Sequence, residues 1–390
     1  MKKMLMLATT AAMSEQFNKN NILILEEMGY EVHVAGNWKE GNPISYERLE
    51  QFKEWLAEHQ GKWFHIPATR KPYDLRNNFV AYKEVVRLIK EYEYEFIHCH
   101  TPIGSVIGRI AAHFTKTKII YTAHGFHFYK GAPLINWFMY YPVEWFLSYW
   151  TDVLITINKE DYQKAQEKFH AKKIEYVPGI GIELEKFSTS CKDKKIIRQQ
   201  IGLSGKEFLV LSVGELIKRK NHEIGIRAIA EINKRGNILD IHYIICGSGP
   251  LMNYLEELAN KLNVGEYVHF LGYRTDVVEL CHCSDVFLFM SQQEGLPVAL
   301  MEAMACQLPV ICSKIRGNVD LIEHGINGLF CTNCSYDLAD MILELLENKE
   351  IQKEYGNNAK EKVGQFESKM IDEKMKVEYE EILQKREEVQ

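Results

Sequence analysis

The chain lacks the features that define several classes of protein. Its 390 residues include only 10 prolines and 25 glycines, which excludes a collagen-like or broadly disordered chain. No apolar run approaches the roughly 18 residues that a membrane-spanning helix needs. The formal charge is 47 − 53 = −6, so nucleic acid is not an expected partner. What remains is a globular chain long enough for two domains.

Disulfide and metal frameworks are also missing. The nine cysteines are odd in number and irregularly spaced, unlike a disulfide scaffold. Cys281-His282-Cys283 and Cys331-x-x-Cys334 suggest zinc ligands, but neither group has a convincing second pair. We therefore expect reduced thiols, no metal and a reducing cytoplasm.

The N-terminus is similar to a short signal peptide, because Lys2-Lys3 precedes the apolar run Met4–Met13. The run continues directly into Ser14-Glu15-Gln16 and a helical pattern. The first strand of an α/β domain has this form, and we expect the run to be that strand.

Short apolar runs alternate with amphipathic stretches, which predicts parallel sheets wrapped by helices. In the first half, the expected strands are Met4–Ala8, Glu31–Ala35, Phe96–Cys99, Lys118–Thr122 and Val153–Ile157, with helices at Phe17–Met28 and Phe79–Lys90. In the second half, they are Phe208–Val213, Ile241–Cys246, Val268–Leu271, Val286–Met290 and Pro309–Cys312, with helices beginning near Asn221, Pro250, Thr275, Pro297 and Asn318. We predict two α/β units joined by the charged linker Glu183–Gln200, and a C-terminal helix over Ile371–Gln390.

Charged and aromatic residues are unevenly distributed. Residues 1–190 carry 23 Lys and Arg against 22 Asp and Glu, residues 191–390 carry 24 against 31, and residues 60–130 alone carry 11 against 5. Residues 126–150 hold 11 of the 44 aromatic side chains. This combination favours contact with an anionic membrane surface. A solvated basic surface and an aromatic core helix are the alternatives.

Candidate site residues follow the strands, because ligands of open α/β sheets bind beyond the carboxyl ends of the strands. Phe208–Val213 is followed by Gly214 and Lys218-Arg219-Lys220, which suits a diphosphate unless the loop is merely solvated. Ile241–Cys246 is followed by Gly247-Ser248-Gly249-Pro250, a tight turn. This turn alone is weak evidence for a nucleotide.

Two carboxylates and three histidines complete the set. Glu294 lies on the loop after Val286–Met290 and Glu302 about two turns into the next helix, with Gly295 and Pro297 leaving backbone N–H groups free for an anion. Such carboxylates can hold sugar hydroxyls. In the first half, His98, His100 and His124 lie at two strand ends, which favours a ligand site in the cleft between the units over a structural role.

Taken together, Gly214-x5-Lys220, Gly247-x-Gly249-Pro250 and Glu294-Gly295-Leu296-Pro297-x4-Glu302 resemble the family-4 retaining glycosyltransferases. Pro178-Gly179-Ile180-Gly181 lies where that family has its interdomain turn. The resemblance implies the α/β GT-B fold, with two Rossmann-like domains facing across a cleft. It places the acceptor-side domain at residues 1–182, with the crossing helix at about 371–390, and the nucleotide-sugar domain at residues 200–370.

The resemblance also implies residue roles. The expected catalytic residues are His124, Lys220 and Glu294. Lys220, helped by Arg219, would bind the diphosphate, Glu302 the ribose, Glu294 and His124 the sugar, and the backbone near Tyr273-Arg274 would border the base. The full donor set is Gly214, Arg219, Lys220, Gly249, Tyr273, Arg274, Glu294, Gly295, Leu296, Pro297 and Glu302. The acceptor-side candidates are Thr10, His100, His124, Phe126 and Tyr129.

Two departures affect this assignment. Glu215 stands where the family usually has arginine, so it must point away from a phosphate or pair with Lys218 or Arg219. The usual glycine pair after the first strand is replaced by Ala8-Thr9-Thr10-Ala11-Ala12.

The implied activity is retaining transfer from a nucleotide-diphosphate sugar, taken as UDP-linked. No cofactor and no metal are implied, and the chain has no Asp-x-Asp motif. The run Thr122–Gly131 is also similar to bacterial capsule and exopolysaccharide glycosyltransferases. That similarity implies a polyprenyl-diphosphate-linked saccharide acceptor and a peripheral position on the cytoplasmic face of the inner membrane.

The alternatives are a GT-B-fold nucleotide-sugar 2-epimerase and a non-catalytic nucleotide-sugar-binding protein. A nicotinamide dehydrogenase is disfavoured because no Gly-x-Gly-x-x-Gly follows the first strand.

Overall fold

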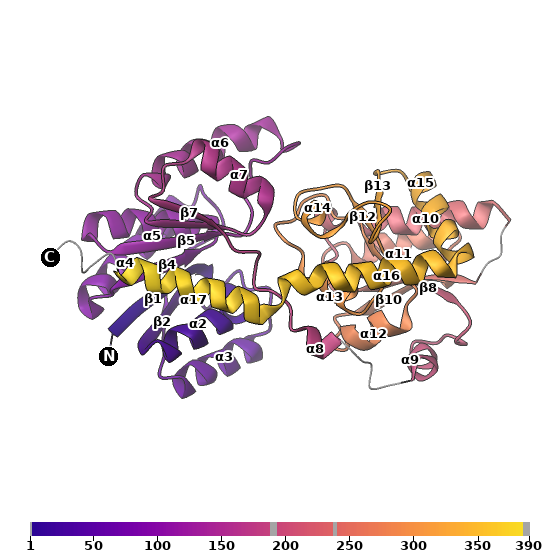
Figure 1. The fold of residues 1–390 in the computed structure, drawn as a ribbon, viewed down its shortest axis with the longest axis horizontal. Coiled ribbons are helices and arrows are strands. Elements are labelled where there is room, and N and C mark those ends of the chain that lie inside the picture. Colours follow the sequence, from indigo (N-terminus) through magenta and orange to yellow (C-terminus); the bar gives the residue numbers. More distant parts are fainter. Residues whose placement is uncertain (1, 188–192, 237–239, 385–390) are drawn as a thin grey trace. The chain divides into compact units, whose positions relative to one another are not determined.

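The computed structural model describes residues 2–187, 193–236 and 240–384. The chain forms two α/β units (Figure 1). Unit 1 comprises Met1–Ile180 and Ser368–Gln390, and unit 2 comprises Gly181–Glu367. Each unit is built on one parallel sheet, which confirms the predicted fold class.

Seven strands form the sheet of unit 1, in the order β3-β2-β1-β4-β5-β6-β7. Their bounds are β1 Lys2–Thr10, β2 Tyr30–Asn37, β3 Lys62–His65, β4 Phe96–His100, β5 Lys118–Ala123, β6 Val153–Thr156 and β7 Lys173–Tyr176. The apolar N-terminal run forms β1, which lies inside the sheet and is buried from Met4 onwards.

Helices cover both faces of this sheet. One face packs against α4 (Leu75–Tyr92), α5 (Pro102–Thr115), α6 (Leu134–Ser148) and α7 (Lys159–Lys168). The other packs against α1 (Ala11–Phe17), α2 (Lys19–Glu27), α3 (Tyr46–Glu58) and α17 (Ser368–Gln384). The helix expected from Phe17 to Met28 therefore starts six residues earlier and is divided at Asn18.

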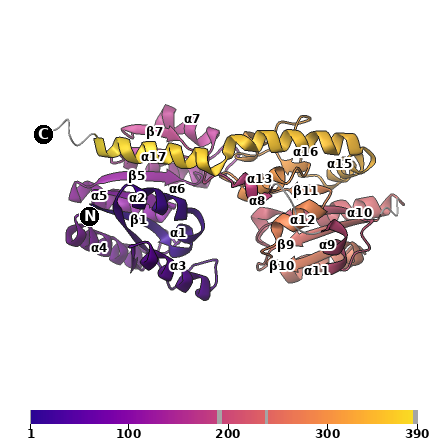
Figure 2. The same ribbon diagram turned by 60° about the horizontal axis from the view of Figure 1, so that its bottom comes forward.

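The C-terminal helix α17 belongs to unit 1, as predicted. It buries Ile371, Met375, Tyr379 and Ile382 in the core, and Lys173 Nζ lies 2.8 Å from both carboxylate oxygens of Glu378. Figures 1 and 2 show α17 running beside α2. Residues 385–390 of the predicted helix lie outside the described residues.

The aromatic stretch is divided between core and surface. Phe126 and Phe128 are buried and stack on each other, and the inner side of α6 packs against the same core through Trp137, Tyr140 and Tyr141. The opposite side of α6 is a stripe of exposed apolar residues: Leu134, Ile135, Phe138, Met139, Val143, Trp145 and Phe146. Leu134 and Phe138 are 76% and 77% exposed. The interpretation as an aromatic core helix therefore holds for the inner side of α6, and contact of the exposed side with a membrane stays a prediction.

One ion pair anchors α6 to α5. Arg109 is almost fully buried, and its guanidinium lies 2.8 Å from a carboxylate oxygen of Glu144 and 4.4 Å from the centroid of the Tyr121 ring. Arg109 is one of the basic residues counted between 60 and 130, so it contributes nothing to a basic surface. Lys62 and Arg87 are also in ion pairs, with Glu31 and with Glu84 and Glu91.

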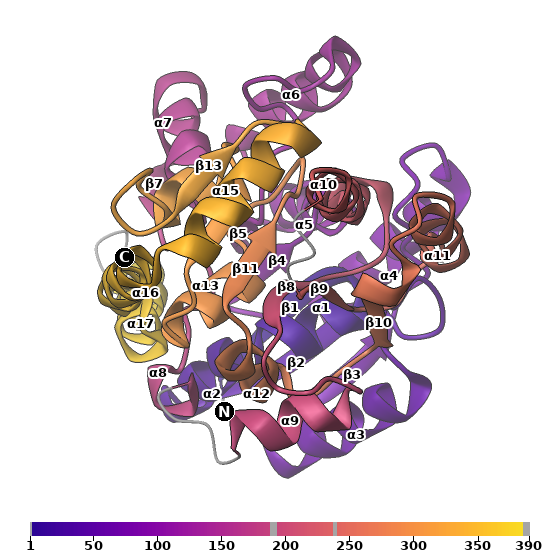
Figure 3. The same ribbon diagram turned by 90° about the vertical axis from the view of Figure 1, so that its right-hand side faces the viewer.

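Unit 2 contains a six-stranded sheet in the order β10-β9-β8-β11-β12-β13. The bounds are β8 Phe208–Val213, β9 Ile241–Cys246, β10 Val268–Gly272, β11 Val286–Phe289, β12 Val310–Ser313 and β13 Leu329–Cys331. One face packs against α10 (His222–Lys234), α11 (Met252–Lys261) and α15 (Ser335–Glu347). The other face carries α12 (Val277–Cys283) and α13 (Val298–Ala305), and α16 (Lys349–Val363) packs against α13 and α15 (Figure 3). The short helix α14 spans Asn318–Leu321.

The segment expected as a linker is part of unit 2. Its helices α8 (Leu184–Phe187) and α9 (Lys194–Gln200) contact α13 and α12 respectively. Arg198 on α9 is buried and lies 2.9 Å from a carboxylate oxygen of Asp285. The sequence predicts an interdomain linker and an approach helix here; α9 is a helix in this segment, and the ion pair of Arg198 holds it to unit 2. Residues 188–192 lie outside the described residues.

Candidate functional site

The cations predicted to bind a diphosphate lie on the turn after β8. The chain passes from Val213 through Gly214 into a 3₁₀ turn, η1 (Lys218–Lys220). The Nζ atom of Lys220 lies 2.8 Å from Glu294 Oε1 and 5.0 Å from the centroid of the Phe289 ring. Arg219 places a guanidinium nitrogen 3.0 Å from the same Glu294 oxygen. The structure therefore brings together three of the predicted site residues.

Glu294 is the centre of this cluster. The hydroxyl of Ser291 donates to the same Oε1 at 2.5 Å, and Glu294 is mostly buried. Arg219 also donates to the backbone carbonyl of Gln293 at 2.6 Å. One carboxylate thus neutralises two cations that could equally bind a phosphate.

Two residues that the sequence did not predict hold the Glu294 loop in place. Arg316 is buried and donates from Nε to the carbonyl oxygen of Glu294 at 3.1 Å. Gly317 has φ of +81°, and a Cβ there would lie 2.3 Å from the carbonyl oxygen of Gly295. Only glycine allows this approach. Their one sequence signal is their position, just past the carboxyl end of β12.

The Glu294 loop leads into α13, whose N-terminus follows Pro297. Its first backbone N–H groups have no partner within the helix and suit an anion. Leu296 is buried beside them. Glu302, on the same helix, has its pKa raised to about 7 because burial disfavours the charged form, with a further contribution from nearby Cys306. A carboxylate in this environment gains from a ligand that donates hydrogen bonds to it.

The glycine-rich turn after β9 packs directly on the phosphate turn. Gly247 donates to the carbonyl of Gly272 at 2.8 Å, and a Cβ on Gly247 would lie 1.9 Å from the carbonyl oxygen of Gly214. A Cβ on Gly249 would lie 2.6 Å from the carbonyl oxygen of Leu216. The glycines are thus explained by contact between two loops.

Tyr273 and Arg274 follow β10 at the same edge of the sheet. Tyr273 is exposed. Arg274 makes a two-pronged ion pair with Asp276, with nitrogen–oxygen distances of 2.7 and 2.5 Å. Glu215 is exposed, and within the described part of the chain it has no recorded ion pair with Lys218 or Arg219. Arg219 pairs with Glu294 instead.

A cavity of about 640 Å³ opens beside this cluster, within the size range of ligand sites. It is lined by residues that follow β11, β12 and β13, such as Ser291, Gln292, Lys314 and Thr332, and by His324 and Phe330 from before and within β13.

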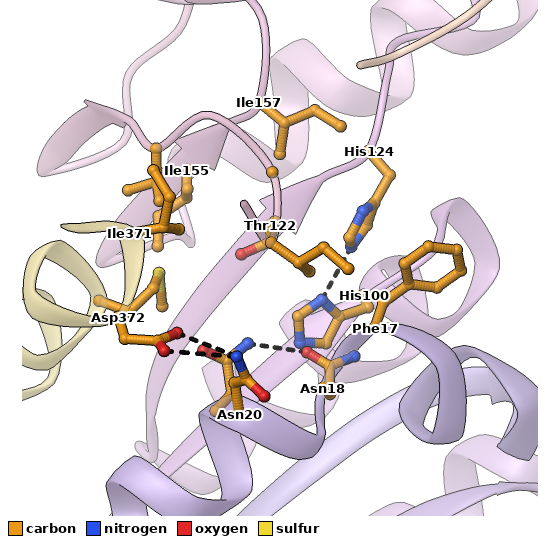
Figure 4. A pocket seen from close by; sticks show the side chains of 15 residues that line it. Phe17, Asn18, Asn20, His100, Thr122, His124, Ile155, Ile157, Ile371 and Asp372 are labelled. Carbon is orange, nitrogen blue, oxygen red and sulfur yellow. Dashed lines mark hydrogen bonds between the residues drawn. The ribbon is translucent and has the colours of Figure 1, made fainter. Parts of the chain in front are cut away.

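In unit 1, two of the predicted histidines, His100 and His124, contact each other across the strand ends of β4 and β5 (Figure 4). His100 Nδ1 lies 3.0 Å from His124 Nε2. His98 contacts the hydroxyls of Tyr379 and Thr122, each at 2.8 Å. Burial lowers the pKa of His98 to about 3 and that of His124 to about 4, and it holds the pKa of His100 well below its usual value. All three are neutral near pH 7.

Only some of the acceptor-side candidates are exposed. His124 and Tyr129 are partly exposed, whereas Thr10, His100 and Phe126 are buried. Phe126 packs against Phe128 and Phe169, so its side chain has no surface left for an acceptor. The sequence places Phe126 next to His124 but does not show whether its side chain faces the core or the site.

Comparison with known proteins shows the family of the chain. Residues 23–185 match the family model described as Glycosyltransferase Family 4, and residues 193–362 match that described as Glycosyl transferases group 1. The chain is 34% identical over 379 residues to EpsD of Bacillus subtilis, whose assigned name is that of a glycosyltransferase, and the match covers 95% of both chains. The chain belongs to the family-4 glycosyltransferases.

Two further proteins are similar to the chain. A galactosyltransferase of Escherichia coli, named for transfer from UDP-Gal to α-D-GlcNAc-diphosphoundecaprenol, is 29% identical over 269 residues, covering 68% of this chain and 69% of the relative. The crystal structure of HepE from Anabaena in complex with UDP and glucose matches with a TM-score of 0.78 at 22% identity, covering 98% of this chain and all of HepE. This match shows the shared GT-B fold.

Proposed function

We propose that this glycosyltransferase moves a sugar from a UDP-sugar to a polyprenyl-diphosphate-linked saccharide during cell-surface polysaccharide synthesis. The observation that carries the proposal is the cluster of Lys220, Arg219 and Glu294 beside the N-terminus of α13. The names of the E. coli galactosyltransferase and of CapM, a capsular polysaccharide glycosyltransferase of Staphylococcus aureus, support the acceptor class and the pathway.

In the proposed mechanism, the cations and the helix N-terminus stabilise the leaving group. Lys220, Arg219 and the backbone N–H groups near Gly295–Pro297 face the negative charge that develops on the departing diphosphate. Glu302 binds the ribose hydroxyls, and the chain near Tyr273 and Arg274 borders the base. Gly214 and Gly249 lie on the two packed loops that border the phosphates in this scheme.

The acceptor hydroxyl attacks on the face that the leaving group vacates, so the anomeric configuration is retained. The departing phosphate oxygen takes the proton of that hydroxyl, and no metal is required in this scheme. Glu294 and His124 orient the sugar.

Diphosphate binding has a consequence for Glu294. Lys220 and Arg219 contact its Oε1 at 2.8 and 3.0 Å, and phosphate oxygens attract the same cations through charge-assisted hydrogen bonds. A bound diphosphate therefore competes with the carboxylate and releases it to accept hydrogen bonds from sugar hydroxyls. Donor binding and sugar orientation are coupled through this exchange of partners.

The proposed acceptor is a lipid, and the exposed stripe on α6 supports docking to the membrane that holds it. In the described residues, no helix is long and apolar enough to cross a membrane. A partly buried amphipathic helix can instead lie in the interface plane, with apolar and aromatic side chains below the headgroups. We place the enzyme on the cytoplasmic face, where nucleotide sugars are available.

Release of UDP in the presence and absence of acceptor tests the proposal. The purified chain is incubated with a panel of UDP-sugars, with and without undecaprenyl-diphosphate-linked GlcNAc. We expect one donor to release UDP only with the acceptor and to give an extended glycolipid. UDP release without acceptor would indicate a 2-epimerase, and an intact donor in every mixture would indicate a binding protein.

A further inference from the structure

Methionine 6 occupies an unusual position behind the site histidines of unit 1. It lies on β1, is fully buried, and its sulfur is 3.2 Å from Nε2 of His100. His100 in turn contacts His124 through its other ring nitrogen at 3.0 Å. A chain of contacts therefore runs from the sulfur of Met6 through His100 to His124, which is partly exposed.

The direction of each hydrogen bond in this chain follows from the chemistry of its atoms. A thioether sulfur can only accept, so Nε2 of His100 carries the proton. His100 is neutral because burial holds its pKa well below the usual value, so its Nδ1 is bare and accepts. The nitrogen facing it, Nε2 of His124, therefore carries a proton. His124 is neutral as well, which leaves its Nδ1 bare.

We propose that Met6 and His100 fix the tautomer of His124, so that Nδ1 of His124 acts only as an acceptor for a hydroxyl of the transferred sugar. Met6 and His100 are then positioning residues that determine specificity. That this hydroxyl belongs to a transferred sugar rests on the proposed function. The tautomer of His124 does not depend on that function.

The neighbouring histidine shows why the sulfur matters. Both ring nitrogens of His98 face hydroxyls, those of Tyr379 and Thr122. A hydroxyl can donate or accept, so either tautomer of His98 is satisfied. His100 differs because one of its partners is a sulfur.

The backbone holds His100 firmly in this arrangement. Thr101 has φ of +67° and ψ of 148°, a conformation that is unusual for a β-branched residue. Its hydroxyl donates to the carbonyl of His100 and lies 2.7 Å from the hydroxyl of Thr9 on β1. The end of β4 is thereby tied to β1, the strand that carries Met6.

Substitution of Met6 provides the test, and the chain offers a matched control. Met6→Leu keeps a similar volume but removes the acceptor. His100 is then free to place its proton on Nδ1, which reverses the bond to His124 and leaves the proton of His124 on Nδ1. Met4→Leu makes the same replacement two residues earlier on the same face of β1, where Met4 is equally buried.

Proton positions are measured on the full chain labelled with ¹⁵N-histidine, using long-range ¹H–¹⁵N correlations assigned with His124→Gln. We expect a proton on Nε2 of His124 in the wild type and in Met4→Leu, and on Nδ1 in Met6→Leu. A proton on Nδ1 in the wild type overturns the proposal, even if Met6→Leu does not fold. The same tautomer in wild type and Met6→Leu also overturns it.

Donor analogues test the contact with the sugar. Fluorine cannot donate a hydrogen bond, so at the hydroxyl bound by Nδ1 the fluoro and deoxy donors should both lose about three- to tenfold in kcat/KM. In Met6→Leu, the fluoro donor should recover relative to the deoxy donor. If the NMR result holds but no position shows this pattern, the contact between His124 and the sugar is wrong, and the tautomer assignment stands.

Discussion

At the scale of single residues, the site depends on which charges pair with which. Glu294 holds Lys220 and Arg219, and Arg316 holds the backbone of Glu294. Glu302 on α13 is partly buried and lies near Cys306 at the end of that helix. Each of these side chains has a specific partner, so single substitutions should have separable effects.

Replacing Lys220 tests its role at the diphosphate. Lys220→Ala should lower kcat/KM by roughly 10²–10³-fold, the usual effect of removing one group that stabilises developing charge, and should weaken UDP binding. Steady-state transfer and calorimetric titration with UDP measure both. Lys218→Ala is the control, because Lys218 is exposed on the same turn. Equal losses in the two variants would contradict the assignment.

Glu302 should make stability fall as pH rises. Its folded pKa of about 7 lies above the ordinary value of 4.5 for this carboxyl, so the folded state binds the proton more tightly. Stability from this group is fully present below about pH 4.5 and is lost as pH rises through 7. Between pH 5 and 8, the free energy of unfolding should fall by about 1–3 kcal/mol less in Glu302→Gln than in the wild type. Urea unfolding at each pH measures this difference.

The exposed Glu257 on α11 provides a control for that measurement. Glu257→Gln should show the same decline as the wild type. If the free energy of unfolding falls equally with pH in the wild type and in Glu302→Gln, the surroundings of Glu302 do not raise its pKa.

At the scale of elements, α6 stands out because one of its sides exposes a stripe of apolar side chains. Its two sides differ because Glu144, Leu147 and Ser148 face the core while Leu134 and Phe138 are exposed. The buried pair of Arg109 and Glu144 fixes its rotation. Composition alone identified an aromatic segment, but it could not separate the core side from the exposed side.

Charge substitutions on α6 should abolish vesicle binding. Leu134→Glu with Phe138→Glu removes roughly 1.5–3 kcal/mol of apolar transfer for each side chain and adds repulsion from anionic lipid. We expect at least a tenfold weaker association with phosphatidylglycerol vesicles in flotation, and an unchanged Tm. Ile196→Glu, at an exposed apolar position on α9 of unit 2, is the control. Undiminished binding by the double variant would remove α6 from the membrane-docking account.

The elements also show what the sequence could and could not predict. The bounds of β8 and β9 were predicted to the residue because both are largely apolar runs that end directly before a glycine, Gly214 or Gly247. The edge strands β3 and β7 were missed since each has four residues of mixed polarity, and β13 was missed since it has only three residues. The beginning of α1 was missed because Ala11–Met13 continued the apolar run of β1.

Site residues divide in a similar way. Lys220, Glu294 and His124 were predicted because charged or titratable residues followed apolar strands. Arg316, Gly317 and Met6 act through contacts with distant parts of the chain, at Glu294, Gly295 and His100. Their residue types carry no signal of those contacts, and only the tertiary structure reveals them.

At the scale of the whole molecule, the two units have different chemistry. Unit 2 carries the cations, the glycine turns and the carboxylates expected to bind a nucleotide sugar. Unit 1 carries neutral histidines and the exposed stripe of α6. This division fits a reaction in which a charged donor and a lipid-linked acceptor meet, and the family membership of the chain supports it.

The central claim is retaining transfer to a lipid-linked saccharide, and the configuration of the product tests it most directly. The chain is incubated with its UDP-sugar and the undecaprenyl-diphosphate-linked acceptor, and the new glycosidic bond is examined by ¹H NMR. We predict that an α-linked donor gives an α-linked product and that Lys220→Ala forms it far more slowly. A β-linked product, or transfer undiminished in Lys220→Ala, would contradict the account.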